Sequence, residues 1–225
     1  MTRGILIAGI ESSLSEAVAA EAEKKVEQYA AAFIPNRHLD SAWERLPPAE
    51  GRKARLSLDW NPGSPISART LVLAAENRLD HVDEAILICT PPSMRRPVEQ
   101  LAPVDIDIVV NDYIKSWFFL VKELTVAFKT RNAGILALVL SDAGSGNDKR
   151  AAPDLMGPSV SAAFHAFVQG LLTAAPNKPY QTLAFSSEAG EDAEFAAYIF
   201  KTIEENNKRN LGKWHKYGRL RFFGR

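Results

Sequence analysis

Residues 4–20 read GILIAGIESSLSEAVAA, an apolar burst that passes Gly9 and runs directly into a serine- and alanine-rich segment. The apolar run at residues 4–9 predicts a buried strand. The Ser/Glu start and apolar spacing of residues 11–29 predict a helix. The chain therefore opens with a strand, a turn and a helix.

The same alternation continues along the chain. Further strands are predicted at 31–35, 54–60, 84–89, 134–141, 180–186 and 218–223, and further helices at 38–46, 66–82, 105–130, 159–175 and 191–207. The connections between strands are too long for hairpins, which is typical of parallel βαβ units. Near-continuous apolar strands indicate a sheet that is covered on both faces. We expect a single α/β domain over residues 1–225, with a doubly wound parallel sheet of about seven strands and helices on both faces.

Composition narrows the function classes. The 225 residues include 27 Lys and Arg against 27 Asp and Glu, so no global field steers the protein to nucleic acid or an anionic membrane. No apolar stretch reaches the roughly 20 residues that span a bilayer, and no signal peptide is evident. The single cysteine, Cys89, excludes an intramolecular disulfide and a cysteine-based zinc site. We expect a cytoplasmic protein without a bound metal.

The first turn resembles that of a known family. Residues 8–15 read AGIESSLS, which is similar to the TGxxxGxG turn of the short-chain dehydrogenases/reductases, a family that the chain resembles over nearly its full length. Gly9 matches, while Ser13 and Ser15 stand where the family has glycines that let the backbone approach a pyrophosphate. Either the serines and the helix amides still form a weakened phosphate site, or Ser12, Ser13 and Ser15 only cap the helix.

The resemblance assigns three more positions to a cofactor. Asp59 stands where the family contacts adenine, and Arg37 where an NADP-preferring member holds the 2′-phosphate. Thr90 opens the segment Thr90-Pro91-Pro92, where the family has an NNAG loop beside the nicotinamide ribose. Asp59 can instead be a turn former and Arg37 a surface residue, and the prolines stiffen the loop. The resemblance thus implies NAD or NADP, bound weakly or lost.

The catalytic positions of the family are altered. Ser141 in GILALVLSDAG matches the catalytic serine, and Asn111 in DIVVNDYIKSWFF matches the asparagine that holds a proton-relay water. Aligning the next helix places Ser161 and His165 where the family has its Tyr-xxx-Lys pair. A serine hydroxyl is far too weak an acid to replace a phenol with a pKa of about 10.

Two of these residues keep alternatives open. Asn111 can be a relic of the family site or can stabilise a helix kink. His165 can act as an acid or base with Ser161 one helical turn away, or it can pack or meet another subunit.

Two functions remain open. The first is a divergent member of the family without standard hydride transfer, acting through oligomerisation or ligand binding. The alternative is an NAD(P)-dependent oxidoreductase that uses substitute residues, namely Ser141, Asn111 and His165. Family members pair through the helices that correspond to 105–130 and 159–175, so the resemblance implies a homodimer or homotetramer.

The region after residue 200 is rich in Lys and Arg with interleaved aromatics, as in grooves for single-stranded nucleic acid. In the family it docks on the sheet and often on a partner subunit. We therefore do not expect nucleic acid binding.

Overall fold

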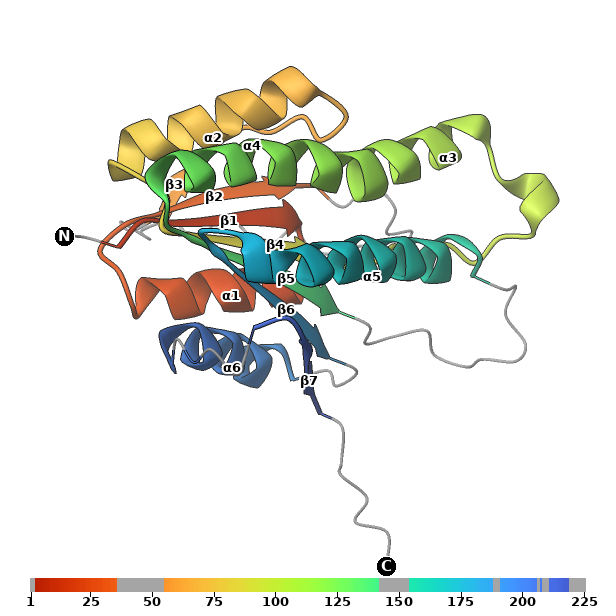
Figure 1. The fold of residues 1–225 in the computed structure, drawn as a ribbon. Helices are drawn as coiled ribbons and strands as arrows, with labels where there is room; N and C mark the ends of the chain where they lie inside the picture. The colour runs from red at the N-terminus through yellow and green to blue at the C-terminus, as the bar shows by residue number, and fades with distance from the viewer. Residues whose placement is uncertain are drawn as a thin grey trace, which may run out of the picture.

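The computed structural model describes residues 3–35, 55–141, 154–187, 191–205, 207 and 211–218. In this part of the chain, seven parallel strands form one sheet in the order β3-β2-β1-β4-β5-β6-β7 (Figure 1). The strands are β1 Ile5–Ile10, β2 Tyr29–Ile34, β3 Arg55–Ser57, β4 Glu84–Cys89, β5 Ile135–Ser141, β6 Gln181–Ser187 and β7 Trp214–Tyr217. Strand order reverses between β1 and β4, which confirms the predicted doubly wound sheet.

Helices cover both faces of this sheet. The helices are α1 Ser13–Glu23, α2 Pro65–Leu79, α3 Pro103–Val110, α4 Ser116–Arg131, α5 Met156–Ala174 and α6 Asp192–Glu205, with short 3-10 turns at Val98–Gln100 and Ala175–Asn177. Helices α1 and α6 lie on one face, and α2, α4 and α5 lie on the other (Figure 1). Strands β1 and β4 are buried along their whole length, which explains their near-continuous apolar sequence.

The face under α2, α4 and α5 holds an aromatic cluster. Trp117 on α4 lies 6.0 Å from Trp60 and 5.6 Å from Phe164 on α5, measured between ring centroids. The opposite core contains Phe195 and Ile199 of α6, packed with the apolar side of α1. Burial of these large side chains is the main force that holds the three layers together.

The long helix predicted at 105–130 is interrupted. A π-helical segment, Asn111–Lys115, separates α3 from α4. Within it, the Lys115 Nζ donates to the Asn111 Oδ1 at 3.0 Å. At the start of α4, the Ser116 hydroxyl donates to the backbone carbonyl of Asp112 at 2.7 Å. Tyr113 in this segment and Trp117 just after it are both buried in the core.

Other boundaries also differ from the prediction. A strand that was not predicted lies at 214–217, and the aromatic side chains of 214, 215 and 217 pack against α5, β6 and α6. Residues 219–223 and the helix predicted at 38–46 lie outside the described residues. Helix α1 ends at Glu23, earlier than the predicted residue 29. None of the described helices has the length and apolar character to cross a membrane.

Candidate functional site

The carboxyl ends of the parallel strands meet at one edge of the sheet. Ser13 and Ser15 follow β1, Thr90 follows β4 and Ser141 ends β5, and these three strands are neighbours. Asp59 lies two residues beyond β3 and is exposed. The predicted cofactor and catalytic serines therefore share the edge where ligands bind in folds of this kind. Arg37 lies outside the described residues.

The turn after β1 is closed by its own serines. Ser12 is the N-cap of α1: its hydroxyl accepts from the Ser15 amide at 3.1 Å, and the Ser15 hydroxyl accepts from the Ser12 amide at 2.8 Å. The Glu16 amide donates to the Ser12 carbonyl at 3.1 Å. The Thr90 hydroxyl donates to the Ser12 hydroxyl at 3.2 Å. This capping box satisfies the Ser12 and Ser15 amides at the helix start.

A carboxylate from another helix completes this turn. The Ser13 hydroxyl donates to the Asp192 Oδ2 at 2.5 Å, and Asp192 is the first residue of α6. We call these five residues, Ser12, Ser13, Ser15, Thr90 and Asp192, the serine turn. Asp192 was not among the sequence-predicted site residues. An acidic residue at the start of a predicted helix indicates only helix stabilisation, so the sequence carries no signal of its contact with Ser13.

Gly9 has a packing role at the end of β1. A Cβ atom at this position would lie 2.5 Å from the Ile88 carbonyl oxygen of β4. The glycine therefore permits the close pairing of β1 and β4, independently of any ligand.

The serine turn can be tested against the pyrophosphate of a dinucleotide. That group needs free hydrogen-bond donors and a close approach of the backbone. Here the Ser15 and Glu16 amides donate to Ser12, and the Ser13 hydroxyl donates to a carboxylate. Ser13 and Ser15 also carry β-carbons where close approach favours glycine. With the Asp192 carboxylate in contact with Ser13, this turn does not fit a pyrophosphate.

The start of α5 lies directly on the loop after β4. The Asp154 Oδ1 accepts from the Gly157 amide at 3.0 Å, and the backbones of Arg95 and Asp154 form an isolated bridge. A Cβ atom on Gly157 would lie 2.5 Å from the Pro92 carbonyl oxygen. The loop that begins at Thr90 is thus fastened to α5, next to the end of β5.

The candidate catalytic residues have separate surroundings. Ser141 ends β5 opposite Ser187 of β6 and is half-buried. The amide oxygen of Asn111 accepts from Lys115, and the backbone at Gly63 packs against the Asn111 side chain. Ser161 is half-buried on α5.

His165 is exposed and stacks on Trp214 of β7, with 4.7 Å between ring centroids and an interplanar angle of 3°. Strand β6 lies between β5 and β7, so this stack directs the imidazole toward the β7 side of the sheet.

Two tyrosines are candidates for the phenol of the family's Tyr-xxx-Lys pair. Tyr180 precedes β6 at the amino edge, and the register, Ile135 opposite Gln181 and Ser141 opposite Ser187, places it a full strand length from Ser141. Tyr113 is 1% exposed, and burial raises the pKa of its phenol. Neither is placed as an accessible acid beside Ser141.

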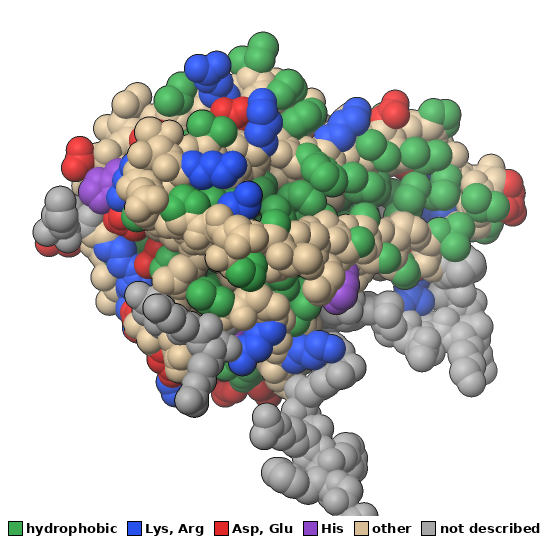
Figure 2. Space-filling view, in the orientation of Figure 1, with side chains coloured by type: hydrophobic (Ala, Val, Ile, Leu, Met, Phe, Trp, Pro, Cys, Tyr) green, Lys and Arg blue, Asp and Glu red, His purple; other side chains and the backbone are tan. Residues whose placement is uncertain are grey.

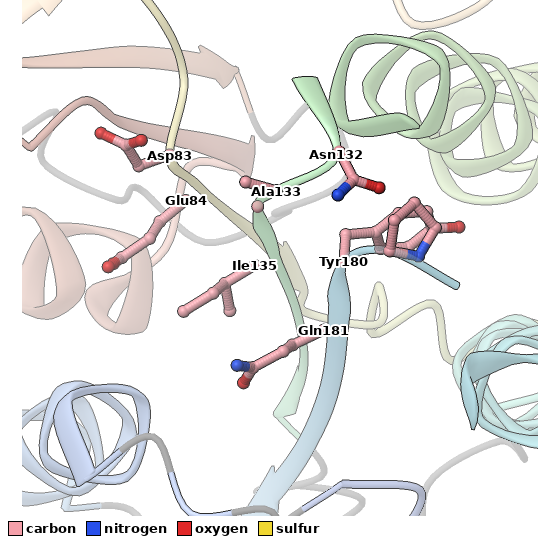
Figure 3. A pocket seen from close by; sticks show the side chains of 9 residues that line it. Asp83, Glu84, Asn132, Ala133, Ile135, Tyr180 and Gln181 are labelled. Atoms are coloured by element: carbon pink, nitrogen blue, oxygen red, sulfur yellow. The ribbon is translucent and has the colours of Figure 1, made fainter. Parts of the chain in front are cut away.

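A pocket of about 360 Å³ lies at the opposite, amino edge of the sheet. Asp83 and Glu84 lie to one side of it and Asn132 and Tyr180 to the other (Figure 3). Its carboxylates have structural partners: Glu84 pairs with Arg3, and Asp83 accepts from Arg131 at 3.0 Å. Burial raises the pKa of Glu84 despite that arginine. This pocket is remote from the carboxyl edge. The ion pairs of Glu84 with Arg3 and of Asp83 with Arg131 stabilise the start of β4.

Among the described residues, no three His, Cys, Asp or Glu side chains are grouped as a metal site requires.

No protein-family model matches the chain, and no curated protein matches it. Solved structures are similar along almost its whole length. A short chain dehydrogenase from Mycobacterium smegmatis is 14% identical, with a TM-score of 0.70 over 98% of this chain and 94% of that one. ElxO with NADP bound is 13% identical, with a TM-score of 0.72 over 96% and 97%.

The NADH-dependent reductase A1-R', complexed with NAD, is 15% identical, with a TM-score of 0.69 over 96% of this chain and 94% of that one. Identities this low establish architecture and leave chemistry open. Together with the strand order, they show that this chain has the Rossmann-like fold of the short-chain dehydrogenases/reductases.

Proposed function

We propose that the protein is a non-catalytic member of the short-chain dehydrogenase/reductase fold, and that it works as a self-associating subunit. The observation that supports the proposal is the serine turn, where the Ser13 hydroxyl donates to the Asp192 carboxylate at the turn to which the family resemblance assigns a pyrophosphate. A dinucleotide that cannot be held there cannot supply a hydride to a substrate at this edge.

The proton-donor side supports the same conclusion. Reduction of a carbonyl needs an acid of suitable pKa within reach of the developing alkoxide. Ser161 is too weak an acid, and His165 is stacked on Trp214 toward the β7 side. Under this proposal, the protein has neither a site that holds the hydride-donating cofactor nor a residue that donates the proton.

The surface of α4 and α5 supports self-association. Phe118 on α4 is 54% exposed, and its ring lies 4.5 Å from that of Phe167 on α5. Val126, eight residues further along α4, is 55% exposed and so lies on the same side of the helix. We call these three residues the α4–α5 face. Hydrophobic side chains gather in the band between the two helices and over α3 (Figure 2).

An apolar helix face of this kind suits a second copy of the chain. A twofold axis brings the same patch of both subunits together, so Phe118 and Phe167 would each meet their equivalents or each other. Aromatic anchors at the centre of such an interface supply most of the binding energy. The paired helices are those that the family resemblance implied, 105–130 and 159–175.

Sedimentation velocity at micromolar concentration tests this proposal. The wild-type chain is expected to sediment as a dimer or tetramer, and Phe118→Glu as a monomer, because a charge would be buried without a partner. Leu73→Glu on α2, where the replaced side chain is 49% exposed, is the matched control and should leave the assembly intact. A wild-type monomer would contradict the proposal.

A dinucleotide-dependent reductase is the second candidate. It is favoured by the two similar structures that hold NADP or NAD. Titration with NADH and NADPH, followed by the fluorescence of the four tryptophans, separates the candidates. Saturable binding of either cofactor would favour the reductase, whereas the main proposal expects none.

A further inference from the structure

Helices α1 and α6 run side by side in the same direction on one face of the sheet (Figure 1). Each follows a parallel strand, so both helices begin at the carboxyl edge. Near their carboxyl-terminal ends, the Lys25 Nζ lies 3.1 Å from the Glu204 carboxylate. At their amino-terminal ends, Ser13 donates to Asp192. Polar contacts at both ends, with apolar packing between them, fix Asp192 against the first turn of α1.

The amino-terminal end of a helix attracts negative charge, because unpaired amides and the helix dipole point outward there. Asp192 supplies such a charge to two helices at once, since it begins α6 and contacts the first residue of α1. In folds that bind phosphate at the start of this helix, an external anion would meet this carboxylate.

Further negative charges near the serine turn in the sequence add to the repulsion that Asp192 exerts on an external anion. Glu11, Glu191 and Glu194 are exposed within three residues of the serine turn in sequence. Glu16 lies in the first turn of α1 and is paired with Arg55 at 3.1 Å. A second anion placed at the turn would face the Asp192 carboxylate at short range, where like charges repel strongly.

We infer that Asp192 is an internal anion that fills the phosphate position of this fold and excludes nucleoside diphosphates from it. The inference deepens the proposed function, on which it rests, by naming the residue that closes the site. Removal of this one charge should admit a diphosphate, more weakly than a glycine-rich turn would, because the capping box engages the Ser12 and Ser15 amides and does not include those of Ser13 and Leu14.

The test is Asp192→Asn, which keeps an oxygen that can accept from Ser13 and removes only the charge. Glu205→Gln, at the other end of α6 and exposed, is the control for an equal change in net charge. ADP and inorganic pyrophosphate are titrated into each protein at low salt by calorimetry. We expect at least a roughly tenfold gain in affinity for ADP in Asp192→Asn and no gain in Glu205→Gln.

Ser13→Ala separates charge from hydrogen bonding, because it removes the bond and keeps the carboxylate. This variant should bind ADP no better than wild type. The inference is overturned if Asp192→Asn binds ADP no better than wild type, or if Ser13→Ala gains as much as Asp192→Asn. Neither result would bear on the sedimentation experiment, so failure here is distinct from failure of self-association.

Discussion

The serine turn lies at the carboxyl edge of the sheet, whereas the α4–α5 face lies on the helices that cover one side of it, and the two regions differ in how completely their surface groups are paired or covered. At the serine turn, hydroxyls and amides are paired with one another and with Asp192. At the α4–α5 face, Phe118 remains more than half exposed, because only one part of its ring packs against Phe167. Polar groups that are already satisfied offer little to a ligand, whereas uncovered aromatic surface gains free energy when it is buried. The α4–α5 face is therefore the surface on which the proposed self-association is tested, and the serine turn is the place where ligand binding is tested.

The largest expected effect comes from the glycine that lets β1 reach the serine turn. Gly9→Ala should lower the free energy of unfolding by about 3 kcal/mol, because the new methyl group would meet the Ile88 carbonyl oxygen. Urea unfolding followed by circular dichroism measures the loss. Gly170→Ala on α5 has open space and should gain up to about 1 kcal/mol from helix propensity. Equal stability of Gly9→Ala and wild type would show that the strand end is looser than described.

The next effect tests how tightly the serine turn is closed. Ser12→Ala should cost about 1–2 kcal/mol, since it removes an N-cap and leaves the half-buried Thr90 hydroxyl without this partner. Ser64→Ala removes the N-cap of α2, which accepts from the Ser67 amide, and should cost less. Thermal unfolding of both variants checks the order. If Ser64→Ala lost more stability than Ser12→Ala, the serine turn would contribute no more to stability than the N-cap of α2 does.

The third prediction concerns His165 on α5 and asks whether its stack on Trp214 contributes to stability or to assembly. His165→Ala should lower stability by about 1 kcal/mol through the lost stack on Trp214. The assembly state should not change, because the stack faces β7 and not the α4–α5 face. Gln169→Ala, exposed on the same helix, is the control and should leave stability unchanged. A fall in assembly without a fall in stability would place His165 in a subunit contact instead.

The smallest effect concerns ionisation at β7. The hydrogen bond from Tyr217 to Glu194, 2.6 Å long, raises the pKa of the phenol from 10.0 to about 12. The folded protein therefore holds this proton more tightly than the unfolded chain. The stability it adds is present below pH 10 and is lost as the pH rises toward 12.

Ultraviolet titration of wild type minus Tyr217→Phe isolates this phenol among the five tyrosines. A difference curve centred near 10, the ordinary value, would show that the bond to Glu194 is not kept in solution.

Much of the fold was predictable from the sequence. The apolar runs of β1, β4 and β5 and the amphipathic character of α5 and α6 are local patterns that burial imposes on short segments. The break at Asn111–Lys115 was anticipated only by the interpretation of Asn111 as a kink stabiliser, because a helix that is apolar on nearly every side has a periodicity that does not distinguish a π turn from a regular turn. The position of β7 was missed because two basic and aromatic stretches, 214–217 and 218–223, have similar strand patterns.

The candidate site was predictable only as a set of positions. Ser13, Ser15, Thr90 and Ser141 could be placed at strand ends, since parallel strands share one edge. Their partners could not be assigned, because hydroxyls have many possible acceptors and the choice depends on which helices lie beside them. The contact between Ser13 and Asp192 joins residues 179 positions apart.

By itself, the sequence determined the alternation of strands and helices, because hydrophobic periodicity is a local property of the chain. It also determined that no cysteine pair and no net charge would dominate the chemistry. Only the tertiary structure decided that α6 brings Asp192 to the first turn of α1, and that β7 brings Trp214 to His165. Such contacts depend on strand order and helix packing, which arise when the whole sheet buries both of its faces.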